Sequence, residues 1–203
     1  MTRKLESALA KRSQQPTPRQ VTDAKYALAR RAALSKLVDV AYANVDSPLG
    51  PLVVAVTRKG VVCVHYGSDD AALQELARKI SPRIMNAPAE LDEVRRELDE
   101  YFAGARQRFD FRIDWALMGP FQQRVLKATY RIPFGKVASY RDVATKAGAP
   151  GASRAAGNAL GANPIPIVVP CHRVVRTGGQ LGGYTGGLHR KEFLLELEGA
   201  LAR

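Results

Sequence analysis

The hydrophobic pattern of this chain changes its period part-way along, and that change limits the possible folds more than any other feature. Between residues 37 and 66, β-branched residues are frequent in three short runs, separated by turn sequences at 47–50 and 58–60, and in the first run apolar residues recur with a period of two. Such alternation is typical of strands with one buried face. Beyond Trp115 the apolar residues recur at helical spacing instead. Two kinds of structure are therefore expected in succession.

The first of these, residues 37–114, is predicted to be a small α/β domain. The three runs favour an antiparallel meander because only short turns join them. Helices are expected over 69–80 and 89–102, the second of them amphipathic, and 109–115 returns to extended chain. We expect a small antiparallel sheet with these helices packed on it.

The second part, residues 115–203, is predicted to be mostly helical. Pro120 stands where the first turn of a helix tolerates proline, ahead of a helix over 121–132. Further on, Ser139 with Asp142 three residues later resembles a capping box.

Two short helices over 139–163, joined by a Gly/Pro turn, form a helix-turn-helix candidate, although any helical hairpin shows a similar pattern. Ser153 is expected to cap the second helix, which is built almost wholly of Ala and Gly. A helix so bare usually packs tightly in a core. The alternative is a slim helix that enters the minor groove of DNA, with Arg154 projecting from its N-terminal end.

Positive charge is concentrated at the start of the chain. The net charge is +12, and residues 1–40 hold nine Lys/Arg against three Asp/Glu. Residues 1–36 are predicted to be a basic extension with a helix over 23–36. A positive field of this kind attracts polyanions such as nucleic acid, although a soluble protein can also simply be basic.

No apolar run approaches the roughly 18 residues of a membrane-spanning helix, and no secretory signal is evident at the N-terminus. A cytoplasmic protein without membrane contact is expected. Its two cysteines, 108 positions apart, are expected to be separate thiols. Cys63 is interpreted as core, and His65 two residues on has no further cysteine near it, so neither a metal nor a cofactor is expected.

The second thiol, Cys171, lies between two apolar runs. Residues 165–169 are interpreted as a buried strand that Pro170 ends, and 174–175 as a further strand. A buried cysteine is more often inert than reactive. A nucleophilic one needs its pKa lowered by a base or a positive charge, and His172 is adjacent.

Neighbouring residues of an extended chain point in opposite directions, so a water between Cys171 and His172 is the natural path for the thiol proton. A carboxylate that orients the imidazole must then come from elsewhere. The C-terminal helix over 189–199 offers three, and spacing does not choose among them: Glu192, Glu196 and Glu198.

Residues 170–175, Pro-Cys-His-Arg-Val-Val, resemble the active-site signature of the O6-alkylguanine-DNA alkyltransferases, the methylated-DNA–protein-cysteine methyltransferases. The resemblance covers roughly 115–199 closely and the strands from Leu37, including SPLGPL at 47–52, more loosely. Collinear segments on both sides carry it further: PFGKVASY at 133–140, NPIP at 163–166, GYTGG at 183–187 and KEFLLELEG at 191–199.

The resemblance implies a role for each matching residue. Cys171 would accept the alkyl group, His172 would act as a base through water, Glu198 would bind His172, and Asn163 would brace the turn before the nucleophile. Tyr140 would press on the target phosphate and give a proton to the guanine. Arg154 would fill the gap in the base stack from a DNA-binding helix that includes Ser153, Ala155 and Gly157. The base pocket would be lined by Tyr184, Thr185, Leu160 and Val174.

The resemblance also implies a ribonuclease-H-like N-terminal fold and irreversible repair of O6-alkylguanine, and of O4-alkylthymine, in duplex DNA. The base would be flipped out through the minor groove, and each molecule would act once, as a monomer, with side-by-side binding along DNA left open. Three alternatives fit these residues less well. A related lesion sensor has Trp in place of the nucleophile, a helix-turn-helix regulator has no need of the Cys171 motif, and a cysteine hydrolase needs Cys and His in direct contact.

Overall fold

The computed structural model describes residues 16–34, 37–67 and 70–201. The chain divides after Leu37 into two compact units, each described by itself. In the first, helix α2 (Pro18–Leu34) begins at a reciprocal cap, in which the Thr17 amide donates to Gln20 Oε1 (2.9 Å) and the Gln20 amide to Thr17 Oγ1 (3.3 Å). The helix therefore starts earlier than the predicted residue 23; its predicted last two positions, 35–36, lie outside the described residues.

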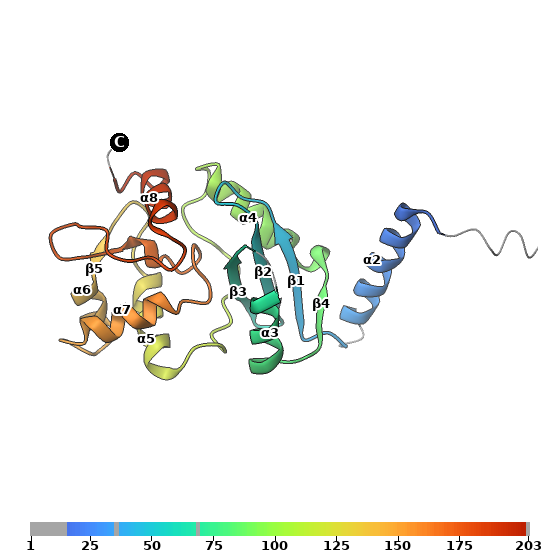
Figure 1. Ribbon diagram of the computed structural model, residues 1–203, viewed down its shortest axis with the longest axis horizontal. Helices are drawn as coiled ribbons and strands as arrows, with labels where there is room; N and C mark the ends of the chain where they lie inside the picture. The colour runs from blue at the N-terminus through green and yellow to red at the C-terminus, as the bar shows by residue number, and fades with distance from the viewer. Residues whose placement is uncertain (1–15, 35–36, 68–69, 202–203) are drawn as a thin grey trace, which may run out of the picture. The chain divides into compact units, whose positions relative to one another are not determined.

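The second unit opens with a four-stranded sheet of order β3-β2-β1-β4 (Figure 1). The predicted meander is confirmed, because β1 (Val40–Val45), β2 (Leu52–Thr57) and β3 (Gly60–Tyr66) pair antiparallel in succession. The sheet is nevertheless mixed. A short strand that the sequence did not predict, β4 (Ile84–Asn86), pairs parallel with β1, because helix α3 (Asp70–Lys79) carries the chain back before it.

Two helical segments cover this sheet. Helix α3 (Asp70–Lys79) packs on it through Ala72 and Leu76, in a core cluster that includes Cys63, as expected for that thiol. The predicted helix over 89–102 is divided into a 3-10 turn, η1 (Pro88–Leu91), and α4 (Asp92–Phe102). The predicted extended run at 109–115 forms only a bridge, Val61 to Ile113.

The second half of this unit is built mainly from helices α5 (Pro120–Tyr130), α6 (Tyr140–Lys146), α7 (Ser153–Gly161) and α8 (Leu188–Leu197). The predicted capping box is present, since the Ser139 side chain accepts from the Asp142 amide and Asp142 Oδ2 accepts from the Ser139 amide. Ser153, in contrast, does not cap α7. It is the first helical residue, and Ala152 precedes it without a side-chain cap.

The predicted buried strand at 165–169 is wrong, although its residues are indeed buried. They form a turn in which Ile167 has a positive φ of 74°. Prolines at 164, 166 and 170 remove the amide donors that a strand requires. The turn closes on itself through the Val169 amide and the Ile165 carbonyl (2.9 Å), and the Pro164 carbonyl accepts from Val64 of β3 (2.9 Å).

Cys171 therefore begins a 3-10 turn, η2 (Cys171–Arg173), and is not part of an extended chain. The short strand predicted after it is present as β6 (Val174–Val175), which pairs parallel with β5 (Ala138–Ser139). Within the described part of the chain, no helix is both long and apolar enough to cross a membrane.

Candidate active site

The Cys171 side chain lies at a place where two cavities of the second unit meet. It is only 9% exposed, yet it lines both of them, one of about 510 Å³ and one of about 690 Å³. Leu160, Gly161, Tyr184 and Thr185 also line both. The larger cavity is rimmed by Tyr140, Arg154 and Arg176, and the smaller one extends toward β3 and α3.

Asn163 holds the turn that carries this thiol. Its Nδ2 donates to the Val169 carbonyl (2.9 Å) and to Cys171 Sγ (3.2 Å), and its Oδ1 accepts from the Ile165 amide (3.0 Å). One side chain thus replaces the ladder bonds that the prolines prevent. It also places a hydrogen-bond donor on the sulfur, which favours the thiolate.

Behind the thiol, a buried carboxylate gathers three side chains. Glu198 Oε1 is 2.9 Å from His172 Nε2 and accepts from the Tyr101 hydroxyl at 2.6 Å. Arg173 donates to both carboxylate oxygens, through Nε to Oε2 (2.8 Å) and Nη2 to Oε1 (2.9 Å), and through Nη1 to the Ile132 carbonyl (2.6 Å). The geometry therefore selects Glu198 from the three carboxylates that the sequence left open.

The charges of this cluster follow from its burial and its bonds. Burial alone would raise the pKa of Glu198, but hydrogen bonds from His172 and Arg173 hold that pKa at about 2. Burial lowers the pKa of His172, although Glu198 opposes this. The imidazole is therefore neutral near pH 7 and donates from Nε2. Its Nδ1 makes no hydrogen bond to any described residue and is thus the nitrogen free to accept a proton.

Burial raises the pKa of the Cys171 thiol in the free protein and so works against the thiolate that a nucleophile requires. The hydrogen bond from Asn163 and the charge of Lys191 oppose this rise without overcoming it. The resting sulfur is a protonated thiol, and its proton must leave during the reaction.

Lys191 is fully buried, which lowers its pKa to about 8. Its ammonium donates to the Val174 carbonyl (2.6 Å) and to the Leu181 carbonyl, and so ties the loop after β6 to helix α8. At the end of that loop Tyr184 is hydrogen-bonded to Tyr66 of β3 (2.8 Å between hydroxyl oxygens). Burial raises the pKa of both phenols, which remain neutral.

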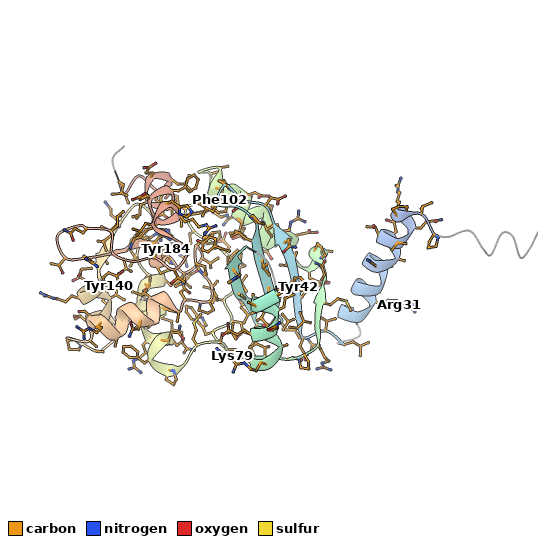
Figure 2. All side chains as sticks on the ribbon, in the orientation of Figure 1. Arg31, Tyr42, Lys79, Phe102, Tyr140 and Tyr184 are labelled. Atoms are coloured by element: carbon orange, nitrogen blue, oxygen red, sulfur yellow. The ribbon has the colours of Figure 1, made fainter. Side chains whose placement is uncertain are left out.

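The residues expected to face DNA lie on the rim of the larger cavity. Arg154 and Ala155 are exposed in the first turn of α7, and Ser153 and Gly157 are partly exposed there. The Tyr140 ring lies against Gly157, where an added Cβ would be 3.7 Å from it, and its hydroxyl donates to the Gly183 carbonyl (3.4 Å). Figure 2 marks Tyr140 and Tyr184, both in the helical half of the unit. Burial raises the pKa of Tyr140, so this phenol keeps its proton at neutral pH.

The structure gathers most of the predicted residues at one place. Of the residues predicted to form a base pocket, Leu160, Tyr184 and Thr185 line the cavities, whereas Val174 is fully buried and is not among the lining residues. Sequence reasoning missed four contributors: Tyr66, Tyr101, Arg173 and Lys191. Arg173 lies in the segment 170–175 and Lys191 in the segment 191–199. Cations among apolar residues are rarely buried without a partner, and this could have indicated that both belong to the site. The two tyrosines come from the other half of the unit and gave none.

The structure therefore combines an α/β half with a helical half, and it places a cysteine where two cavities meet, next in sequence to a carboxylate-bound histidine. Residues 40–115 match the family described as 6-O-methylguanine DNA methyltransferase, ribonuclease-like domain. Residues 120–200 match its DNA binding domain.

Individual relatives agree. The chain is 44% identical to the methylated-DNA–protein-cysteine methyltransferase of Mycobacterium tuberculosis over 77% of this chain and 91% of the relative. It is 38% identical to that of Methanosarcina acetivorans, over 78% and 98%. The crystal structure of Mycobacterium tuberculosis OGT in complex with DNA superposes with a TM-score of 0.68 at 40% identity, over 79% of this chain and 93% of that one. The chain therefore belongs to the 6-O-methylguanine DNA methyltransferase family, whose members are DNA repair methyltransferases that bind DNA.

Proposed function

We propose that Cys171 takes the alkyl group directly from O6 of guanine in duplex DNA, and from O4 of thymine. The sulfur attacks the alkyl carbon, a C–S bond forms, and the C–O bond breaks with its electron pair going to the oxygen. The thioether has no leaving group that would regenerate the thiol, so each molecule acts once. The observation that carries this proposal is the buried Cys171 thiol, which lines both cavities and lies beside a neutral, carboxylate-bound His172 in sequence.

The proton movements follow from the charges described above. The Cys171 proton passes through a water molecule to Nδ1 of His172, and Glu198 stabilises the imidazolium that forms. Tyr140, a neutral phenol on the cavity rim, donates a proton to the guanine as the alkyl group departs. Coupling thiol deprotonation to the reaction is consistent with a thiol whose pKa is raised in the free protein.

An O6-alkyl group is inside the base stack, so we propose that the nucleotide rotates out into the larger cavity, at a cost of a few kcal/mol. Arg154 fills the gap from the minor groove, and Ser153, Ala155 and Gly157 let α7 approach the backbone closely. Leu160, Tyr184 and Thr185 contact the flipped base. Asn163 holds the turn before Cys171 and so keeps the sulfur in place.

The wider organisation is also a proposal: a basic extension at 1–36, an α/β domain at 37–114, and a DNA-binding and alkyl-acceptor domain at 115–203. We propose that a monomer acts in the cytoplasm and associates with the nucleoid when bound to DNA.

Titration of the reaction tests this proposal. A duplex carrying O6-methylguanine inside a restriction site is mixed with increasing protein, and recovery of cleavage is measured. Cleavable DNA should rise in a 1:1 ratio with protein and stop there. Continued repair by a substoichiometric amount would contradict single use. Tight binding without recovery would favour a lesion sensor instead.

A further inference from the structure

A groove of about 460 Å³ lies on the other side of the Pro170–Arg173 stretch and is not used by the proposed reaction. Cys171 does not line it. The lining comes from the loop after α4, the end of α5 and the active-site turn: Gln107, Arg108, Phe109, Tyr130, Arg131, Ile132, Pro133, Phe134, Val168, Pro170 and Arg173.

The lining of this groove is cationic. It contains three arginines and no carboxylate. Arg173 is neutralised by Glu198, but the exposed side chains of Arg108 and Arg131 make no hydrogen bond or ion pair among the described residues. The larger cavity beside α7 is also cationic, with two exposed arginines, Arg154 and Arg176, and no carboxylate.

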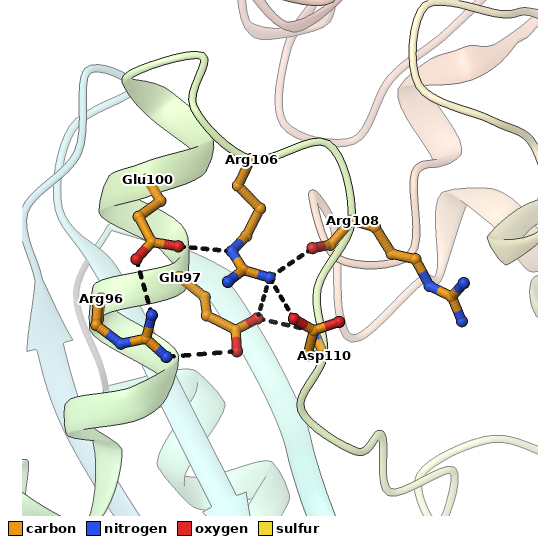
Figure 3. A network of polar contacts seen from close by, with 6 residues as sticks. All are labelled: Arg96, Glu97, Glu100, Arg106, Arg108 and Asp110. Atoms are coloured by element: carbon orange, nitrogen blue, oxygen red, sulfur yellow. Dashed lines mark hydrogen bonds and ion pairs between the residues drawn. The ribbon is translucent and has the colours of Figure 1, made fainter.

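The loop that carries Arg108 is held rigidly by Arg106. That guanidinium is hydrogen-bonded to Glu100 (2.8 Å) and Asp110 (2.8 Å) and lies 3.3 Å from Glu97. It also donates to the Arg108 carbonyl (2.8 Å). Figure 3 shows the Arg108 side chain directed away from these carboxylates. Arg106 is therefore fully paired with these carboxylates, whereas the Arg108 guanidinium acts on Asp110 only at a distance and makes no hydrogen bond or ion pair with a described residue.

Aromatic rings supply the second half of a nucleotide site. Phe134 and Tyr130 are partly exposed in the groove. Both are held in place, Phe134 by an edge contact with Tyr101 (6.2 Å between centroids) and Tyr130 by one with Trp115 (6.4 Å). Fixed rings beside unpaired arginines are what sites for unstacked nucleotides use, the ring for the base and the cation for the phosphate.

We propose that this groove binds a nucleoside phosphate, with its base on the Tyr130–Phe134 wall and its phosphate between Arg108 and Arg131. The nucleotide belongs to a single strand or is free in solution, and the test distinguishes the two. The proposal goes beyond the repair reaction and does not require Cys171.

Photocrosslinking tests it. A 5-bromodeoxyuridine-containing oligodeoxythymidylate, or 5-bromodeoxyuridine monophosphate, is irradiated with the full-length protein under excess undamaged duplex, and the adducts are located by mass spectrometry. We expect adducts at Tyr130 or Phe134 that are still formed in the presence of excess duplex. If the ligand is a single strand, the oligonucleotide should form these adducts and the mononucleotide should not. Adducts confined to the α7 cavity, or groove adducts that the duplex removes, would overturn the proposal.

A charge-matched pair of variants gives a second readout. The variant Arg108→Ala/Arg131→Ala removes two phosphate contacts to a single strand. In the same excess of duplex, it should reduce the slope of log affinity for the oligonucleotide against log salt concentration by about 1.4. Arg58→Ala/Arg78→Ala removes two exposed arginines elsewhere and should leave it unchanged. Equal effects of the two variants would overturn the proposal. The groove adduct should remain in Cys171→Ala, so failure of the repair reaction and failure of this site are separable.

Discussion

Glu198 connects the α/β half and the helical half of the second unit through hydrogen bonds. Its carboxylate binds His172 and Arg173 from the active-site turn and the Tyr101 hydroxyl from α4. A buried charge with all its partners present is tolerated, whereas removing one partner leaves the others uncompensated. The residue therefore controls both the imidazole tautomer and the local stability.

Glu198→Gln should lower the free energy of unfolding by about 3 kcal/mol, because the buried Arg173 charge loses its counter-ion. It should also slow methyl transfer, since the imidazolium loses its stabilising charge. Unfolding and single-turnover transfer, measured on folded protein, check both effects. Glu192→Gln removes an exposed carboxylate from the same helix and should change neither; equal effects of the two substitutions would show that helix α8 alone is being perturbed.

The same residue predicts an acid limit. Its pKa is about 2 in the folded protein against an ordinary value of 4.5, so the unfolded chain binds more protons between these values. The stability that Glu198 contributes is present above pH 4.5 and is lost as the pH falls through about 2. Unfolding curves of the wild type and Glu198→Gln should therefore converge over this window, and a constant difference would contradict the assignment.

Lys191 predicts a second rise of stability with pH, at alkaline pH, where it is loss of the charge that stabilises the fold. Its pKa falls from 10.5 to about 8 on folding, so the folded protein binds fewer protons over that window and stability should rise with pH there. Lys191→Met should cost about 2 kcal/mol near pH 7, because two buried carbonyls lose their donor. Its deficit relative to wild type should widen above pH 8. A deficit that shrinks would contradict a buried, charged Lys191.

Site residues could be predicted from the sequence where they lie in one short motif, and not where their partners are distant in the sequence. Cys171 and His172 follow from one short motif. The choice among three carboxylates did not follow from spacing, and Tyr101 and Tyr66 carry no local signal because their partners are about a hundred positions away. The raised pKa of Cys171 depends on burial by distant elements, which one sequence does not display.

At the scale of elements, local chemistry predicted local structure. The cap at Ser139 and Asp142 is a contact within one turn, and it formed as expected. The segment 165–169 failed because its apolar pattern suits a strand while its prolines prevent one, and Asn163 stabilises the turn instead. Strand β4 was missed because three residues show no period.

Gly182, in the loop between β6 and α8, lies close to the Tyr140 hydroxyl and should determine where this hydroxyl is placed. Gly182 has a positive φ of 68°, and an added Cβ would lie 2.9 Å from the Tyr140 hydroxyl. Gly182→Ala should therefore displace the phenol and slow transfer, by up to about a hundredfold if the displacement reaches about 1 Å. Gly179→Ala has similar strain (φ 84°) with nothing within 4 Å, and serves as the control. Single-turnover transfer is measured for both variants. If Gly179→Ala slows transfer as much as Gly182→Ala does, backbone strain and not the contact with Tyr140 causes the loss.

At the scale of the whole molecule, charge is the main feature. Residues 1–36 hold nine Lys/Arg and two Asp/Glu, and so supply +7 of the net +12. Deleting them should weaken binding to undamaged duplex and flatten its salt dependence, because fewer counterions are released, while methyl transfer remains. Binding titrations at several salt concentrations measure this. Unchanged affinity and slope would show that the extension does not contact DNA.

Intact-protein mass spectrometry shows whether Cys171 becomes alkylated. After incubation with an oligonucleotide duplex containing O6-methylguanine, the protein should gain the mass of one CH₂ group, located at Cys171 by peptide mapping and absent in Cys171→Ala. A folded protein that binds the duplex and keeps its original mass would contradict the account.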